Sequence, residues 1–136
     1  MSWLLDTNIV SELRKTNPNP GVASWAESED PLTMYLSAVV VFELELGVLR
    51  QEQKDSRQGA ILRSWLDDHV LAEFKDRILP VDLAVAVATS RLHVPDPKPV
   101  NDTFIAVTAR IHGLTVVTHN AKDFEGTGVR TLDPWS

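Results

Sequence analysis

The sequence predicts an α/β fold in which a mainly parallel sheet is covered by helices on both faces. Short apolar runs alternate along the chain with longer segments of helical periodicity. This alternation favours parallel pairing, because each helix carries the chain back to the same edge of the sheet. Two apolar runs, at 3–5 and 114–117, lead directly into polar side chains. Parallel sheets bind ligands beyond the carboxyl ends of their strands, so both places are candidates for a functional site.

The first half of the chain contains two predicted strands and three predicted helices. Asp6, Thr7 and Asn8 follow the first apolar run and favour a helix start. "TNPNPG" breaks the helical pattern, and Ser37 is placed to cap the long helix after the second strand. In chain order, the predicted elements are a strand at 3–5, helices at 9–15 and 22–30, a strand at 32–38 and a helix at 38–51.

The second half alternates in the same way and ends with two strands. Apolar residues recur at three- and four-residue spacing between Asp55 and Arg77, which predicts a helix. Asn101 is the predicted N-cap, and Gly113 the predicted terminator, of a helix that follows a loop with three prolines. The predicted elements are a helix within 55–77, a strand at 78–82, a helix at 83–93, a loop at 94–100, a helix at 101–113 and strands at 114–120 and 129–133.

Composition limits the classes to which the protein can belong. The 136 residues fit a single domain spanning 1–136, with a hydrophobic share of 43% and no apolar run near membrane-spanning length. No basic and apolar leader is visible, so we expect neither a secretory signal nor a membrane partner. The absence of cysteine excludes disulfides and thiolate zinc sites and suits a cytoplasmic protein. The net charge of -6 argues mildly against a simple nucleic-acid clamp, but not against an enzyme whose acids hold a cation.

Four of the 19 acids stand out by position, and each has an alternative interpretation. Asp6 ends a buried strand but also fits a helix N-cap. Glu43 follows four apolar residues, yet a solvated helix face fits it equally well. Asp102 starts a helix, where the helix dipole alone favours an acid. Asp123 follows a strand closely and could be an ordinary turn residue.

Their joint placement indicates a metal site. Three of the four acids lie at strand ends or helix starts, which an α/β fold brings together. Carboxylates that share a cleft raise one another's pKa values, and a divalent cation relieves their repulsion. Oxygen ligands favour Mg²⁺ or Mn²⁺ over zinc and suit phosphoryl chemistry. His119 lies beside the same predicted cleft, where a phosphate contact is possible, although a bystander role is favoured. The four tryptophans fit core and interface packing better than base stacking.

Four segments in order resemble the motifs of the PIN-domain family, within it the VapC and FitB type of bacterial toxin ribonuclease. "LLDTNIVSEL" resembles the first motif, and "LSAVVVFELELG" resembles the second, with Glu43 and Gly47 in its Glu-Leu-x-x-Gly end. "NDTFIAVTARIHG" resembles the third, in which Asp102 opens a helix. "LTVVTHNAKDFEGTGV" is similar to the fourth, T-x-N-x-x-D-F, and the closing "DPW" is similar to the family's N-P-W ending.

The resemblance implies a three-layer α/β/α sandwich with a mainly parallel sheet of four to five strands. It implies Mg²⁺- or Mn²⁺-dependent cleavage of single-stranded RNA, with Asp6, Glu43 and Asp102 at the acidic site. We favour Asp123 as the fourth acid, with Thr118 and Asn120 as outer-shell groups. The resemblance also implies a homodimer and a cognate antitoxin that blocks the site, in a heterotetramer or larger assembly.

Two other functions remain open from the sequence. One is a DNA-directed 5′-nuclease-like enzyme, since such nucleases resemble PIN domains in fold. The other is a catalytically inactive binding or scaffold domain that keeps the acids as helix caps. Mg²⁺-dependent stabilisation would distinguish an active domain from an inactive one.

Overall fold

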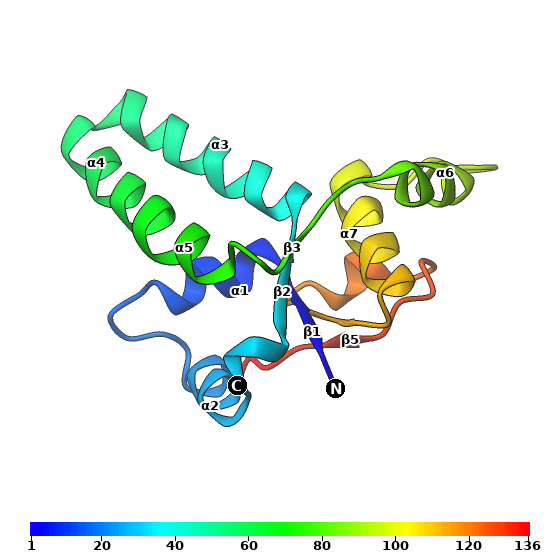
Figure 1. The fold of residues 1–136 in the computed structure, drawn as a ribbon, viewed down its shortest axis with the longest axis horizontal. Coiled ribbons are helices and arrows are strands. Elements are labelled where there is room, and N and C mark those ends of the chain that lie inside the picture. The colour runs from blue at the N-terminus through cyan, green and yellow to red at the C-terminus, as the bar shows by residue number, and fades with distance from the viewer.

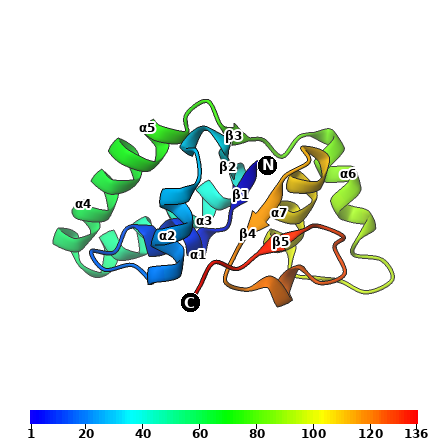
Figure 2. The same ribbon diagram turned by 90° about the horizontal axis from the view of Figure 1, so that it is seen from below.

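Five parallel strands form the centre of the molecule (Figures 1 and 2), in the spatial order β3-β2-β1-β4-β5. The structure is a computed structural model that describes all 136 residues. It confirms the predicted parallel sheet of four to five strands. The strands are β1 (Trp3–Leu5), β2 (Met34–Ser37), β3 (Ile78–Leu79), β4 (Thr115–Val117) and β5 (Thr131–Leu132).

Strand β1 lies in the middle of the sheet and is the point at which the strand order reverses. Leu4 pairs with Tyr35 of β2 on one side and with Val116 of β4 on the other. The chain first builds the sheet toward β3 and then returns to add β4 and β5 on the opposite side. In open parallel sheets, ligands bind at such a reversal. The polar residues after β1 and β4 therefore lie where a site is expected.

Helices cover both faces of the sheet, as the three-layer prediction requires. The helices from α1 to α5 lie on one side and α6 and α7 on the other, which Figures 1 and 2 show from two directions. None of them combines the length and the hydropathy that crossing a membrane would require. The helices are α1 (Thr7–Leu13), α2 (Pro20–Ser28), α3 (Ala38–Lys54), α4 (Ser56–Ser64), α5 (Leu71–Phe74), α6 (Leu83–Arg91) and α7 (Val100–Ile111), with short turns η1 (Pro31–Thr33), η2 (Trp65–Val70) and η3 (Ala121–Phe124).

The core lies between the sheet and these helices. The central strand residues Leu4, Leu36 and Val116 have no exposed surface. Trp3 of β1 and Trp25 of α2 pack edge to face with ring centroids 5.5 Å apart. These two tryptophans therefore have the packing role that the sequence predicted for them.

The predicted helix signals at Ser37 and Gly113 are confirmed. The Ser37 hydroxyl accepts hydrogen bonds from the backbone N–H groups of Val39 and Val40, at 3.0 and 3.2 Å. Gly113 follows α7 with a φ of 68°, which glycine adopts at little cost. The prediction that Asn101 caps α7 is wrong. The helix begins at Val100, directly after the proline-rich loop, and this places Asn101 inside the first turn.

The predicted helix within 55–77 consists of three consecutive pieces. Helix α4 leads into η2, a π-helical segment, and then into the short α5. Of the apolar residues that predicted this helix, Leu66 and Phe74 are buried, Leu62 and Trp65 are partly buried, and Ile61 is 53% exposed, so the spacing identified only part of the inward face. Hydrophobic periodicity does not distinguish a π-helical turn from an α-helical one.

Helices α3 and α4 approach each other closely at Gly59, which leads to a stability prediction. A Cβ atom at Gly59 would lie 2.4 Å from Glu52 Cα, whereas one at Gly47 of α3 would meet nothing within 4 Å. We expect Gly59→Ala to lower the free energy of unfolding by at least about 1–3 kcal/mol through overpacking. Gly47→Ala should raise it by about 0.5–1 kcal/mol, because alanine is the better helix former. Urea unfolding measures the free energy of unfolding of both variants. Equal changes for Gly59→Ala and Gly47→Ala would contradict the close approach of α3 and α4 at Gly59.

Candidate active site

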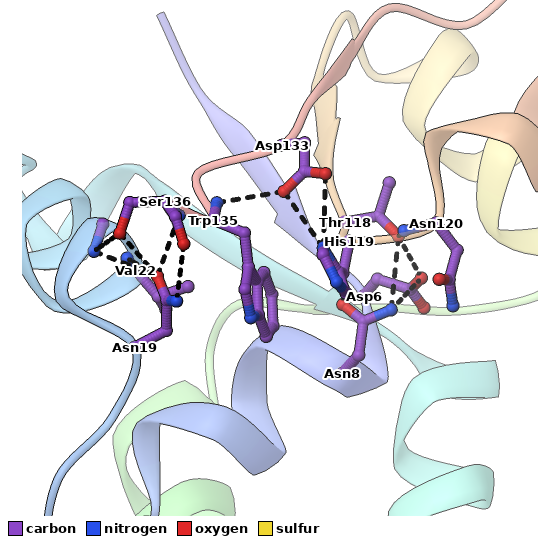
Figure 3. A network of polar contacts seen from close by, with 11 residues as sticks. Asp6, Asn8, Asn19, Val22, Thr118, His119, Asn120, Asp133, Trp135 and Ser136 are labelled. Atoms are coloured by element: carbon purple, nitrogen blue, oxygen red, sulfur yellow. Dashed lines mark hydrogen bonds and ion pairs between the residues drawn. The ribbon is translucent and has the colours of Figure 1, made fainter.

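Asp6 lies at the carboxyl end of β1, where it is held from several directions. Its backbone N–H donates to the carbonyl of Val117 at 2.9 Å, which continues the pairing of β1 with β4. Its Oδ1 accepts from the backbone N–H of Thr7 at 2.8 Å, so Asp6 is the N-cap of α1. Its Oδ2 accepts from the Thr118 hydroxyl at 2.7 Å and from Asn8 Nδ2 at 3.3 Å (Figure 3). The side chain is only 6% exposed, so its charge is poorly screened by water.

Thr118 and Asn120 lie behind Asp6, at the end of β4. Thr118 is fully buried, and its hydroxyl oxygen accepts from the backbone N–H of Asn120 at 3.0 Å and from Asn8 Nδ2 at 3.3 Å. Thr118 thus contacts a carboxylate of the site directly. Asn120 contributes a backbone group, and the residue itself is exposed.

Glu43 extends toward the same region from α3. Its Oε1 accepts from the Thr7 hydroxyl at 2.6 Å, and its Oε2 accepts from Asn101 Nδ2 at 3.4 Å. These contacts connect α3 to the first turns of α1 and α7. Glu45, two residues on, instead pairs with Arg63 at 2.8 Å. The sequence predicts Thr7 only as a capping-type residue and Asn101 only as an N-cap, and it does not indicate their contacts with Glu43.

Asp102 and Asp123 approach the site from the other side of the sheet. Asp102 lies half-buried in the first turn of α7. Asp123 lies exposed on η3, where its backbone N–H donates to the carbonyl of Asn120 at 2.9 Å. The turn interpretation of Asp123 is therefore correct, but its charge also influences Asp6 and Asp102.

The four carboxylates are electrostatically coupled. The pKa of Asp102 is raised to about 6. Burial is the largest cause, and the negative charges of Asp6, Asp123 and Glu43 also contribute. Burial also raises the pKa of Asp6, against the lowering by hydrogen bonds from Thr118 and Thr7, and Glu43 and Asp123 raise it further. None of the four acids belongs to an ion pair of the structure. The site thus carries negative charge that no side chain compensates.

This donor set fits a hard divalent cation that keeps part of its water shell. No three His, Asp or Glu side chains are gathered closely enough to form a complete metal cage. A structural zinc site would need such a cage. Mg²⁺, in contrast, is commonly held by one or two carboxylates, with waters and substrate phosphates as the other ligands. Uncompensated carboxylates without sulfur or histidine among them favour Mg²⁺ or Mn²⁺.

The raised pKa of Asp102 predicts a specific dependence of stability on pH. The native state holds this proton more tightly than the unfolded chain does, because the pKa rises from 3.8 to about 6 on folding. The stabilisation that this bound proton gives to the native state is fully present below pH 3.8 and is lost as pH rises through about 6. We therefore expect Asp102→Asn to raise the thermal midpoint above pH 6 in metal-free buffer and to change it little near pH 4. Parallel pH profiles for wild type and variant would contradict this coupling.

His119 follows Thr118 and is fixed at the edge of the site. Its backbone N–H donates to Asn8 Oδ1 at 3.1 Å, and its Nδ1 lies 3.3 Å from Asp133 Oδ2. Its ring stacks on Trp135, with centroids 4.1 Å apart and an interplanar angle of 23°. These contacts were missed from the sequence, because Asn8 and Trp135 lie far from His119 along the chain.

Comparison with known proteins gives consistent matches over nearly the whole chain. The PIN domain family model matches residues 3–129. The chain is 36% identical to the toxin FitB of Neisseria gonorrhoeae over 138 residues, which cover 97% of each protein. It is 34% identical to the VapC ribonuclease Y4jK of Sinorhizobium fredii over 137 residues, covering 97% of this chain and 96% of that protein. The crystal structure of FitAcB from N. gonorrhoeae superposes with a TM-score of 0.89 at 34% identity and covers 98% of both chains.

Proposed function

Because this chain belongs to the PIN-domain family, we propose that it is a metal-dependent endoribonuclease and the toxin of a toxin–antitoxin pair. The proposed activity of the protein is cleavage of single-stranded RNA in the cytoplasm, with Mg²⁺ or Mn²⁺ as the cofactor. The observation that carries it is the set of four coupled acids, none of them in an ion pair, at the strand-order reversal. The relatives named a VapC ribonuclease and a toxin support the choice of RNA as substrate and of toxin as role.

Each acid has a separate part in the proposed reaction. Asp6 and Asp102 are proposed as the direct ligands, since Asp6 is buried and hydrogen-bonded and its charge helps to raise the pKa of Asp102. Glu43, oriented by Thr7 and Asn101, and Asp123 complete the pocket and orient the attacking water. The cation, when bound, supplies positive charge to the phosphate and lowers the pKa of water. Water attacks phosphorus and gives one proton to an adjacent carboxylate, while the bond to the leaving oxygen breaks and that oxygen takes up a proton from solvent.

The buried groups around Asp6 are proposed to orient it rather than to react. Thr118 donates to Asp6 Oδ2 and Asn8 donates to the same oxygen, which leaves the carboxylate one fixed orientation. Fixed ligands bind a metal more tightly, because little freedom is lost on binding. We assign Thr118 an outer-shell role, and we assign Asn120 to the support of Thr118 through its backbone.

The negative net charge requires local positive groups for RNA to approach. Lys122, next to Asp123, and Arg50, on α3, are exposed and belong to no ion pair. Such cations pair with phosphates away from the scissile bond. The acidic site also suits a basic antitoxin segment, since opposite potentials favour association. We propose that a cognate antitoxin blocks the site and that the toxin is a homodimer, in a heterotetramer or larger complex with the antitoxin.

Expression in bacteria and cleavage by the purified protein test the proposal together. We expect expression of the chain alone to arrest growth and co-expression of the antitoxin encoded beside it to relieve the arrest. The purified protein should cut single-stranded RNA with Mg²⁺ and not with excess EDTA. Normal growth at high levels of folded protein, with no RNA cleavage, would favour an inactive binding domain. Cleavage of DNA but not of RNA would favour the 5′-nuclease-like alternative.

A further inference from the structure

We propose that the stacked rings of His119 and Trp135 form a platform on which a base of the RNA stacks beside the cleavage site. The inference rests on the proposed function, because it assigns a substrate contact to the same site. Neither residue belongs to the acidic cluster. The platform would bind the nucleobase of a nucleotide next to the scissile phosphate, whichever of the four bases it carries.

Asp133 contacts both residues of the platform, through the ring of His119 and the backbone of Trp135. Its Oδ1 accepts from the backbone N–H of Trp135 at 3.0 Å, and its Oδ2 lies 3.3 Å from His119 Nδ1 (Figure 3). Asp133 follows β5, which pairs with β4, so neighbouring strands deliver the two aromatic residues to one place. A surface fixed in this way binds a flat ligand without losing side-chain freedom.

His119 provides the exposed ring of the platform. Its side chain is 49% exposed, and its Nε2 makes no hydrogen bond within the chain. Trp135 is partly buried, packs against the core and stacks on the His119 ring. An exposed and fixed aromatic ring contributes little to the core, but it presents a flat face and a free nitrogen to a ligand.

The platform lies directly beside Asp6. His119 is the next residue after Thr118, whose hydroxyl bonds to Asp6. Its backbone N–H donates to Asn8 Oδ1, and the amide group of Asn8 donates to Asp6 Oδ2. A nucleotide whose phosphate lies at the acids therefore has its own base, or the neighbouring base, within reach of the ring.

The chemistry of a nucleobase fits this surface and the charge of the chain. Proteins that recognise single-stranded RNA stack its bases on aromatic rings, histidine included. Stacking tolerates different sequences, because every base presents a π-face. It also requires no positive charge, which suits a chain with a net charge of -6. Stacking thus supplies binding at a place where the acids repel the backbone of the RNA.

Binding to an uncleaved oligonucleotide tests the platform. In an Asp102→Asn background, which removes a proposed ligand so that RNA stays intact, fluorescence anisotropy measures affinity for a labelled single-stranded oligoribonucleotide. We expect His119→Ala to weaken binding roughly tenfold and His119→Tyr, which retains a stacking ring, to keep most of it. Both variants should remain folded, since His119 is exposed, and thermal unfolding checks this. Equal affinity of the His119→Ala variant and its parent, equal weakening by both substitutions, or no measurable binding to the parent would overturn the platform.

Steady-state kinetics of RNA cleavage distinguish base binding by His119 from a purely structural role of this residue. They also test the platform separately from the proposed ribonuclease function. If the platform binds the base equally in ground and transition states, His119→Ala raises KM more than it lowers kcat. If the ring serves only to hold the chain around Trp135 and Asp133 in place, His119→Ala lowers kcat with KM unchanged, and this result would overturn the proposal. If RNA binding depends on His119 but wild type cuts no RNA, the platform stands and the proposed function fails. If the His119→Ala protein cleaves RNA with the KM and the RNA affinity of its parent, the proposed function stands and the platform fails.

Discussion

Asp6→Asn is expected to lower the rate of metal-dependent RNA cleavage by roughly a hundredfold or more. The substitution preserves the size of the side chain, and asparagine caps helices as well as aspartate does. It removes the charge from a carboxylate that is only 6% exposed, where an ionic interaction with a cation is strongest. Single-turnover rates at saturating Mg²⁺ and limiting RNA measure the effect.

Asp68→Asn is the matched control for this loss. Asp68 is exposed on η2 and makes no side-chain hydrogen bond or ion pair, so its substitution removes one negative charge without touching the site. Its cleavage rate should equal that of wild type. If Asp6→Asn also retains a rate within a few-fold of wild type, Asp6 acts only as the N-cap of α1 and the assignment is wrong.

Asp123→Ala is expected to lower the cleavage rate by roughly tenfold or more, as the loss of supporting charge at a metal site can. Asp123 is exposed, but its negative charge raises the pKa values of both Asp6 and Asp102, so it adds to the negative potential that a cation at these acids would meet. A carboxylate oxygen also stabilises a cation more than a neutral amide does. Single-turnover cleavage by the variant, with folding checked by circular dichroism, measures the loss.

Asn120→Ala is the comparison that decides how the pocket is completed. Asn120 supports Thr118 through its backbone N–H, which alanine retains, so this variant should lose less activity than Asp123→Ala. A larger loss for Asn120→Ala would show that the pocket is completed from the end of β4. A normal rate with reduced stability for Asp123→Ala would show that this residue serves only the turn that its backbone N–H closes.

The position of the site along the sheet could be predicted from the sequence. Apolar runs followed at once by Asp6 and by Thr118 indicate two strand ends, and the carboxyl ends of parallel strands meet at one edge of the sheet. The structure places β1 beside β4, with a hydrogen bond from Thr118 to Asp6. The predicted order of strands and helices was sufficient for this part of the site.

The orientation of Glu43 and the contacts of His119 could not be predicted in this way. Glu43 is held by Thr7 and Asn101, from helices that are distant along the chain, and no local pattern encodes how these helices pack. The sequence predicts Asn101 as an N-cap, because asparagine is a preferred residue at helix starts. The stacking of His119 on Trp135 depends on the pairing of β4 with β5, which brings distant residues together.

Calorimetric titration of Mn²⁺ tests most directly whether the clustered acids hold a divalent cation. Wild-type protein should bind Mn²⁺ near neutral pH, because burial and the charges of the neighbouring acids raise the pKa of Asp102 to about 6 and a cation offsets both effects. Asp68→Asn should bind with the affinity of wild type. Asp6→Asn should bind at least roughly tenfold more weakly, because one charged ligand is lost. Equal Mn²⁺ affinity in wild type and Asp6→Asn, or no binding to wild type, would contradict the proposed metal site.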